Sequence, residues 1–223
     1  MGRTALILGA TGLVGGYLLD NILENNKYER VHIISRSDVL KKHPKLDTYI
    51  LELSRMEDVR EVFNVSDVFC CLGTTMKNAG SKEAFKKVDL DFPLLAAKLA
   101  AEGEAEQFLI VSAMGASSNS SFFYNRVKGE MEERVKSLPF KGVHIFRPSL
   151  LLGNRKEFRL GEKTAEMLFT RLPFLFRGSL KKYAPIKAEQ VAKFMAERAI
   201  KGEKGIFTYE SDEMNRLQKQ EQS

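Results

Sequence analysis

The sequence predicts an α/β fold, a doubly wound and mostly parallel sheet with helices on both faces. Short apolar segments alternate with segments of helical periodicity, which is the pattern of such a sheet. A glycine-rich turn joins the first apolar segment to the first helical one. With 223 residues, 43% of them hydrophobic and 29% charged, the chain is long enough for one good core. We therefore expect a single domain over residues 1–223.

The expected strands are short, rich in Val, Ile, Leu or Phe, and bounded by polar or turn residues. They cover residues 4–8, 30–35, 48–52, 67–71, 107–112 and 143–146, and a last short strand is expected at 205–209. Beyond residue 146 the pattern loosens, and residues 153–185 are expected to form a small variable cap at which a substrate or partner binds. From Ser211 onward the chain is polar and is expected to fray.

Helices are expected where apolar residues recur three and four apart. The sets are Leu13, Val14, Tyr17, Leu18 and Ile22; Phe85, Val88, Phe92, Leu95 and Leu99; and Val127, Met131 and Val135, with a further helix over residues 188–200. Pro93 falls inside the second set. It either kinks that helix or restarts it after a cap at Asp91, and the sequence leaves both alternatives open.

The turn after the first strand predicts a dinucleotide site. Gly9, Gly12 and Gly15 recur at every third position and lead directly into a helix, whose N-terminus attracts a pyrophosphate. The alternative is a tight turn without a ligand. The predicted cofactor-binding residues of this segment are Gly9, Thr11, Gly12, Leu13, Val14 and Gly15.

The end of the second strand indicates which cofactor is bound. An acidic residue there would bind the ribose hydroxyls of NAD, but this chain has Ser35, Arg36 and Ser37. A guanidinium between two hydroxyls suits the 2′-phosphate of NADP(H), because Arg forms bidentate, charge-assisted hydrogen bonds. NADP(H) is therefore favoured over NAD(H), while Asp38, two residues further on, keeps NAD(H) as the alternative.

A phenol and an ammonium stand four residues apart in the predicted helix that contains Val127. Tyr124 and Lys128 project from one face of that helix, and a nearby cation lowers the pKa of a phenol toward the working range of an acid or base. Ser112 ends a strand at the edge of the sheet where ligands bind, so its hydroxyl would hold a substrate oxygen beside the phenol. The alternative is an ordinary pair of exposed side chains on the surface of the helix, without a catalytic role.

These motifs, in their order and spacing, resemble the short-chain dehydrogenase/reductase superfamily. The resemblance rests on the glycine loop, on Tyr124-x-x-x-Lys128 and on residues 147–149, and it covers nearly the whole chain. Within the superfamily the chain is similar to the atypical branch that contains the Tat-interactive-protein-type oxidoreductases. That narrower match rests on the segments Cys70-Cys71-Leu72-Gly73-Thr74-Thr75 and Val88-Asp89-Leu90-Asp91-Phe92, and on Arg147-Pro148 followed by Leu151-Leu152-Gly153 and Arg155.

The resemblance implies a Rossmann fold with bound NADPH, in which Tyr124 is the general acid/base, Lys128 lowers its pKa and holds the nicotinamide ribose, and Ser112 orients the carbonyl. It also implies further cofactor-binding residues: Leu53, Cys71, Leu72, Gly73, Thr74 and Val111, with Pro148, Ser149 and Leu150 near the nicotinamide. Larger members often carry Ser or Thr one or two places beyond Ser112, where this chain has Ala113 and Met114. The C-terminal part is also too short for a sugar-nucleotide cap.

The charge of the chain bears on its partners. Of the net charge of +6, most lies between Arg155 and Lys182, which is either a solvated surface or a wall that attracts an anionic substrate or a protein partner. Phe174, Leu175 and Phe176 in this segment are either core or part of a substrate or partner groove, and a homodimer is another possibility. Without tryptophan or an aromatic-basic pattern, nucleic acid is a poor candidate.

Other site classes are not indicated. His32, His43 and His144 lack ligand spacing, so no metal site is expected. Cys70 and Cys71 are adjacent and are expected to be small buried strand residues, the alternative being a redox sensor. The sequence shows no apolar run of membrane-spanning length and no signal peptide, and the unpaired cysteines favour a reducing, cytoplasmic location.

The leading hypothesis is an NADP(H)-dependent oxidoreductase that reduces a small-molecule carbonyl, with Tyr124 as the proton donor. A second hypothesis is a non-catalytic NADP(H)-binding module that regulates or binds a partner, and a third is an epimerase-like isomerase that keeps its cofactor bound.

Overall fold

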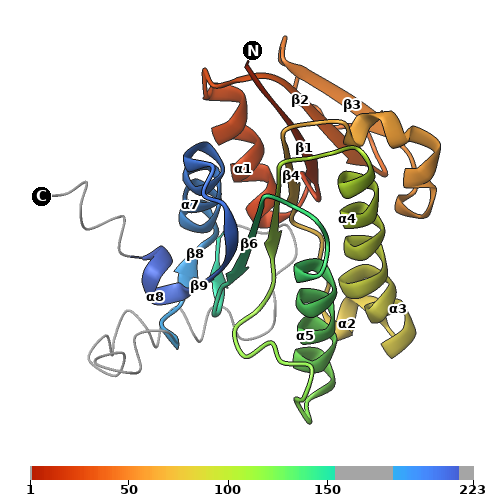
Figure 1. Cartoon of the computed structure of the whole chain (residues 1–223). Helices are drawn as coiled ribbons and strands as arrows, with labels where there is room; N and C mark the ends of the chain where they lie inside the picture. Colours follow the sequence, from red (N-terminus) through yellow and green to blue (C-terminus); the bar gives the residue numbers. More distant parts are fainter. Residues whose placement is uncertain (1, 154–182, 216–223) are drawn as a thin grey trace, which may run out of the picture.

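The computed structural model describes residues 2–153 and 183–215, and these residues form a twisted parallel sheet with helices on both faces (Figure 1). The seven strands run in the order β3-β2-β1-β4-β5-β6-β9, and every neighbouring pair is parallel. Their bounds are β1 (Arg3–Leu8), β2 (Tyr28–Ser35), β3 (Leu46–Ile50), β4 (Asp67–Cys70), β5 (Gln107–Val111), β6 (Gly142–Arg147) and β9 (Gly205–Glu210). The predicted α/β fold is confirmed, and each expected strand is present with its ends shifted by no more than two residues.

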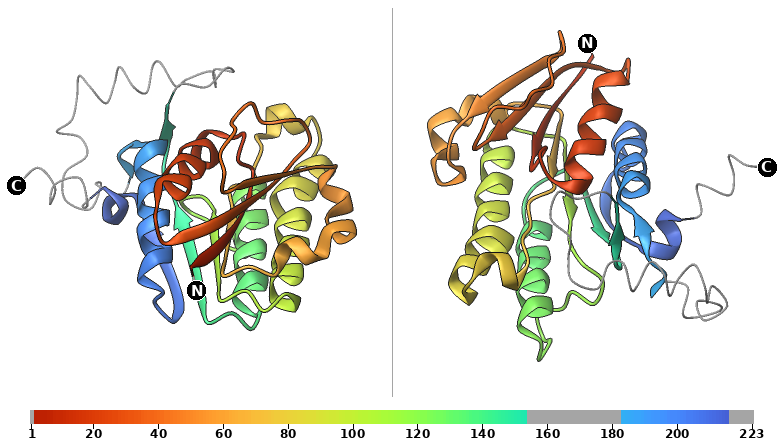
Figure 2. Two further views of the ribbon diagram at one scale, coloured as in Figure 1. Left: turned by 90° about the horizontal axis from the view of Figure 1, so that it is seen from above. Right: turned by 180° about the vertical axis from the view of Figure 1, so that it is seen from behind.

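Two groups of helices cover the sheet. One face carries α1 (Leu13–Glu24) and α7 (Ala188–Lys201), which lie side by side (Figure 2). The other carries the 3₁₀ segment η1 (Leu53–Phe63), α3 (Lys82–Lys86), the π-helical turn η2 (Lys87–Asp91), α4 (Phe92–Glu102) and α5 (Phe123–Lys136). The short helices α2 (Met76–Ala79) and α8 (Ser211–Met214), and the small strand pair β7 (Leu151–Leu152) and β8 (Ile186–Lys187), complete the described residues.

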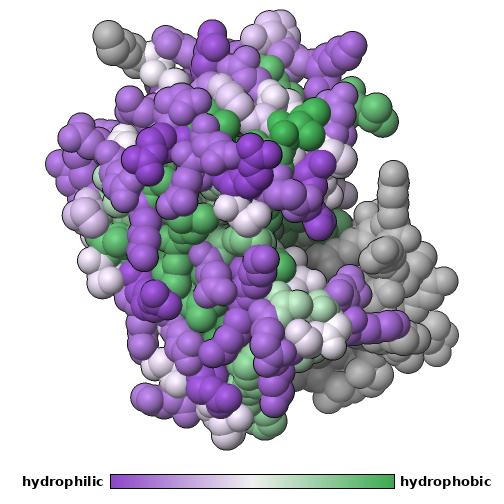
Figure 3. All heavy atoms as spheres, turned by 90° about the vertical axis from the view of Figure 1, so that its right-hand side faces the viewer, coloured by the Kyte–Doolittle hydropathy of each residue, from purple (hydrophilic) through white to green (hydrophobic). Residues whose placement is uncertain are grey.

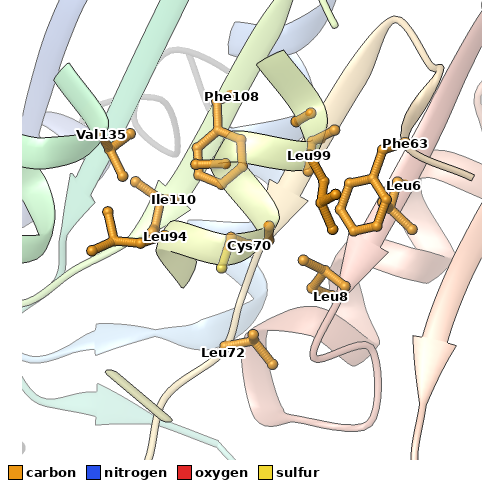
Figure 4. Close-up of a cluster of buried hydrophobic side chains, with 14 of the residues drawn as sticks. Leu6, Leu8, Phe63, Cys70, Leu72, Leu94, Leu99, Phe108, Ile110 and Val135 are labelled. Carbon is orange, nitrogen blue, oxygen red and sulfur yellow. The ribbon is translucent and has the colours of Figure 1, made fainter. Parts of the chain in front are cut away.

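The core lies in two layers because successive strand residues point to opposite faces of the sheet. Leu6 and Leu8 of β1 face α4 and η1, where Phe63, Leu99 and Phe108 are buried with them (Figure 4). The intervening side chains of β1 face the other way, toward α1 and α7. Both faces of the central strands are therefore buried, which explains their continuous apolar sequences.

The helix that contains Pro93 continues through a π-helical turn. Lys87–Asp91 forms this turn between α3 and α4, and Pro93 stands in the first turn of α4, directly after it. Asp91 has helical backbone angles and does not cap α4 with its side chain. Of the two alternatives, a distortion of the helix is therefore the correct one.

The C-terminal part differs from the sequence-based expectation. Ser211 does not begin a frayed tail: it opens α8 and is fully buried, as is Met214. Its hydroxyl accepts a hydrogen bond from the backbone N–H of Ser149 at 2.7 Å, which ties α8 to the segment after β6. The expected cap at 153–185, with its basic Arg155–Lys182 stretch and Phe174–Phe176, lies almost entirely outside the described residues.

A chain of buried polar side chains crosses the sheet, from the amino ends of β2, β4 and β5 to the middle of β6 and to β9. Asp67 accepts hydrogen bonds from Tyr28 and from Gln107, each at 2.7 Å. Gln107 Oε1 then faces His144 Nε2 at 3.2 Å, and His144 Nδ1 lies 3.0 Å from the hydroxyl of Tyr209. His144 is thus a satisfied core histidine, and burial lowers its pKa to about 4.

Seen from the side of α3 and α4, the surface is mostly hydrophilic, and hydrophobic atoms gather in a narrow band between charged side chains (Figure 3). Some exposed apolar surface of this kind is ordinary on a solvated face.

Candidate active site

The site lies where the strand order reverses. The chain runs from β1 outward through β2 and β3, then returns to the other side of β1 with β4. The loops that leave the carboxyl ends of β1 and β4 therefore diverge, and this is where α/β sheets bind their ligands. The backbone N–H of Cys71 donates to the carbonyl of Leu8 at 2.9 Å, so the two loops begin side by side.

Two glycines shape the turn after β1. Gly9 has a φ of +80°, and a Cβ atom on it would lie 2.7 Å from the carbonyl oxygen of Cys71. A Cβ on Gly15 would lie 2.1 Å from the carbonyl oxygen of Gly9, so only glycine lets α1 pack this closely on the turn. These contacts explain the first and third glycines of the motif by steric necessity.

The N-terminus of α1 is suited to an anion. Gly12 is its N-cap and has no side chain to accept from the first-turn N–H groups, and that first turn contains no acidic residue. These amides and the helix dipole are free to meet a phosphate. The cradle thus fits the pyrophosphate of a dinucleotide.

A cleft of about 780 Å³ opens beside this N-terminus. It brings together predicted residues from five parts of the chain: Thr11, Gly12, Leu13, Val14, Cys71, Leu72, Gly73, Thr74, Val111, Ser112, Tyr124, Lys128, Pro148 and Ser149. Lining residues that the sequence analysis missed include Tyr17, Asp20, Val39, Lys41 and Asp89. The loops after β1, β4, β5 and β6 and the first turn of α5 therefore share one space.

Several predicted cofactor residues do not line this cleft. Gly9 and Gly15 lie beneath it as the steric framework. Leu53 begins η1 and packs against the core, and the carbonyl of Leu150 accepts from the N–H of Ile186. Ser35, Arg36 and Ser37 follow β2, beside β1, but none of the three lines the cleft. The Arg36 side chain is exposed and forms no hydrogen bond or ion pair with the described residues.

Tyr124 and Lys128 lie one turn apart on α5, as their spacing predicted, and both side chains line the cleft. The ring of Tyr124 is partly buried and packs against Phe85 at a centroid distance of 5.4 Å. Lys128 is 3% exposed. A cation this deeply buried needs a counter-charge, because the desolvation cost of an unpaired ammonium is large.

Asp89 supplies that counter-charge. Its Oδ1 lies 2.8 Å from Nζ of Lys128, and its Oδ2 accepts the backbone N–H of Thr74 at 2.9 Å. Burial alone would lower the pKa of Lys128, but the carboxylate of Asp89 and the phenol of Tyr124 outweigh it and raise that pKa above its ordinary value. Asp89 thus holds the lysine charged and fixes the loop after β4.

Ser112 has a different buried partner. Its hydroxyl donates to Glu132 at 2.5 Å, and the same carboxylate binds Arg147 at 2.6 and 3.0 Å. Glu132 is 1% exposed and lies one helical turn after Lys128, so α5 carries two buried charges of opposite sign. Arg147 also reaches Glu210 at 3.5 Å, which links the carboxyl ends of β5, β6 and β9.

One of the two cysteines matches the expectation of small buried strand residues: β4 ends at Cys70, whereas Cys71 follows it and lines the cleft. Cys70 is fully buried and Cys71 partly so, and neither forms a disulfide. Burial raises the pKa of Cys70 to about 12 and also raises that of Cys71. Reactive thiols need a lowered pKa, so the redox-sensor alternative finds no support.

No group of His, Cys, Asp and Glu side chains that would hold a metal ion occurs in residues 2–153 and 183–215. Within the same residues, no helix has the length and apolar character to cross a membrane.

The comparison with known families decides the class of the protein. The sequence profile described as "NAD(P)H-binding" matches residues 9–141, more than half of the chain. The chain belongs to the NAD(P)H-binding family. Within this family it is 37% identical to Protein HTATIP2 of Rattus norvegicus over 175 residues, which are 77% of this chain and 72% of that protein. It is 32% identical to Protein FMP52 of Eremothecium gossypii over 220 residues, 97% of this chain and 98% of that protein. The resemblance to the atypical short-chain dehydrogenase/reductases is confirmed.

Solved structures of this fold have lower sequence identity. WbmG of Bordetella bronchiseptica, in complex with NAD and UDP, aligns with a TM-score of 0.69 at 14% identity, covering 96% of this chain and 74% of its own. UDP-glucose 4-epimerase of Thermotoga maritima, with UDP-glucose, gives 0.68 at 15%, covering 97% and 80%. The NAD(P)H-binding chain therefore has their Rossmann fold, and these structures are longer than it is.

The names of the relatives correct one expectation. The FMP52 proteins of Eremothecium gossypii, Debaryomyces hansenii and Candida albicans are all named mitochondrial. The cytoplasmic location expected from the unpaired cysteines was wrong. A free thiol indicates a reducing environment, and this criterion does not specify a compartment.

Proposed function

We propose that this protein is an NADP(H)-dependent oxidoreductase that reduces the carbonyl group of a small molecule. The observation that carries the proposal is the meeting of Tyr124 and Lys128 with the N-terminus of α1 in one cleft. A proton donor, a buried cation and a phosphate cradle are the groups that such a reduction requires.

Each residue has a chemical task in the proposed reaction. When bound, the reduced nicotinamide supplies the hydride that forms the new C–H bond at the carbonyl carbon. Tyr124 donates its phenolic proton to the carbonyl oxygen, and the ammonium of Lys128 stabilises the phenolate that is left. Asp89 keeps Lys128 charged and in place throughout. The phenolate then recovers a proton from solvent, which restores the starting state.

The proposed cofactor is NADP(H). Arg36 follows β2, the strand whose end lies beside the ribose in this fold, and its guanidinium is uncommitted among the described residues. No acidic side chain occupies the position directly after β2. Dissociation constants for NADPH and NADH, measured by the fluorescence of the reduced nicotinamide, test this choice. Equal or tighter binding of NADH would overturn it.

Turnover tests the catalytic proposal. The protein is mixed with NADPH and a panel of aldehydes, ketones and quinones, and NADPH consumption is followed at 340 nm. We expect Tyr124→Phe to abolish reduction while the dissociation constant of NADPH stays within about twofold, because the phenol serves the reaction more than the binding. Tyr49→Phe, which alters a tyrosine of β3 outside the cleft, is the matched control. Tight NADPH binding with no turnover on any substrate would contradict the proposal.

One observation favours a non-catalytic NADP(H)-binding module as the second candidate. The Ser112 hydroxyl donates its proton to Glu132, so it is already committed before any carbonyl arrives. The module predicts that a partner protein binds only with NADPH present and that Tyr124→Phe leaves this binding unchanged. The enzyme hypothesis instead predicts turnover that depends on Tyr124.

A further inference from the structure

Two lysines among the described lining residues of the cleft are each paired with a carboxylate. Lys128 is bound to Asp89, and Lys41 is bound to Asp20. Asp20 lies on α1, and Lys41 lies in the loop that follows β2. Which of these cations an incoming phosphate can recruit depends on how costly each ion pair is to break.

The burial of the two pairs differs sharply. The side chains of Lys128 and Asp89 are 4% and 1% exposed, so separating them would leave two unpaired charges buried away from water. Those of Lys41 and Asp20 are 40% and 48% exposed. An exposed pair contributes little to stability and water can solvate either partner, so it opens readily. Lys41 is therefore the lysine that is available.

Lys41 is also better placed than Arg36 to bind a phosphate in the cleft. The sequence singled out Arg36 as the cation after β2, yet Arg36 does not line the cleft. Lys41, five residues further along the same loop, does line it, together with Val39 and with Tyr17 and Asp20 of α1. The space next to Lys41 is continuous with the cradle at Gly12.

We propose that Lys41 is the residue that selects NADP(H), by leaving Asp20 and binding the 2′-phosphate of the cofactor. This inference rests on the proposed NADP(H) function and identifies the residues that set its specificity. Asp20 acts as an internal competitor: its carboxylate occupies Lys41 in the free protein and is displaced by the more highly charged phosphate. NADH has no 2′-phosphate, so it leaves the pair closed.

The test measures dissociation constants of NADPH and NADH for wild type, Lys41→Ala, Asp20→Asn and the double variant at low ionic strength, where exposed charges are least screened. We expect Lys41→Ala to weaken NADPH binding about tenfold and to leave NADH within about twofold. Asp20→Asn is expected to tighten NADPH several-fold, because the competitor is gone. In the double variant the gain from Asp20→Asn should disappear.

Matched controls are available on both elements. Lys42→Ala removes the adjacent, exposed lysine outside the cleft lining, and Glu24→Gln removes an exposed carboxylate one turn further along α1. Both should leave the two dissociation constants unchanged. All substituted side chains are exposed or partly exposed, so melting temperatures should stay close to that of wild type.

Several results would overturn the inference. One is unchanged NADPH affinity in Lys41→Ala; another is an equal loss for NADPH and NADH, which would place Lys41 at the pyrophosphate. A third is an NADPH preference that only Arg36→Ala removes. Unchanged NADPH affinity in Asp20→Asn would refute the competition. A wild type that binds neither cofactor, or prefers NADH, would instead refute the proposed function itself, so the two failures are distinguishable.

Discussion

Glu132 accepts the hydroxyl proton of Ser112 at 2.5 Å while it holds the guanidinium of Arg147 at 2.6 Å. One buried carboxylate on α5 thus connects the ends of β5 and β6, directly beneath the wall of the cleft. The hydrogen bond to Glu132 is the largest cause of the raised pKa of the Arg147 guanidinium.

Breaking this connection should destabilise the protein. Glu132→Gln leaves Arg147, which is 22% exposed, without its buried counter-charge, and we expect a loss of about 3 kcal/mol in the free energy of unfolding. Urea denaturation measures it. Glu133→Gln, the exposed neighbour on α5, should cost less than about 1 kcal/mol. Equal effects of the two substitutions would show that the buried pair contributes no more to the free energy of unfolding than an exposed carboxylate does.

Removal of the carboxylate that faces Lys128 should change how stability depends on pH. In wild type the pKa of Lys128 is raised, so the stability from this lysine is full below 10.5, its ordinary pKa, and is lost as the pH rises through the raised value. Asp89→Asn removes the main influence that opposes burial and leaves only weaker ones such as Tyr124, so the pKa of Lys128 falls and the variant gains stability relative to wild type as the pH rises. We therefore expect a deficit of about 3 kcal/mol near pH 7 that narrows toward pH 10.

Thermal melting of both proteins between pH 7 and 10 measures this difference. Asp91→Asn, an exposed aspartate two residues along the same turn, is the control and should follow wild type at every pH. A deficit that stays constant over this range would contradict the proposed charge state of Lys128.

Acid should destabilise the protein through His144. Its pKa falls to about 4 from an ordinary 6.5, so it stays neutral in the folded state while the unfolded chain takes up a proton. Its contribution is complete above pH 6.5 and is lost as the pH falls through 4, an effect of about 2 kcal/mol. His144→Gln should flatten the stability profile between these values relative to wild type. An unchanged slope would show that other groups cause the acid sensitivity.

Two adjacent glycines of α1 should respond oppositely to alanine. In Gly15→Ala the new Cβ would collide with the carbonyl of Gly9 at 2.1 Å, so both folding stability and NADPH affinity should fall. In Gly16→Ala the nearest atom, the carbonyl oxygen of Ala10, is 3.7 Å away, and the better helix propensity should stabilise the protein by up to about 1 kcal/mol. Calorimetric melting of the two variants checks this, and a stable Gly15→Ala would refute the steric argument.

The parts of the fold that could be predicted from the sequence are those with local signals. The strand, glycine turn and helix at Gly9–Gly15 depend on neighbours in sequence, and so does the pairing of Tyr124 with Lys128 on one helical face. The segment η1 has no such signal. Its buried residues Met56, Val62 and Phe63 are irregularly spaced, and its backbone leaves helical geometry at Arg55 and Val59.

The buried charges could not be predicted for a different reason. Asp89 and Glu132 look like ordinary polar positions of helices, and only the packing of η2 and α5 against the sheet brings Lys128 and Arg147 to them. The sequence carries no signal for Lys41 either, because only the fold brings the loop after β2 close enough to α1 for Lys41 to pair with Asp20.

The bond between Ser149 and Ser211 has a consequence for the order of synthesis. A growing chain releases the glycine turn, Tyr124 and Lys128 from the ribosome early, but β9 and Ser211 emerge late and must still pair with β6 and the segment after it. The wall at Pro148 and Ser149 is therefore complete only after Ser211 has emerged. A nascent chain halted before β9 would expose the unpaired edge of β6 to aggregation.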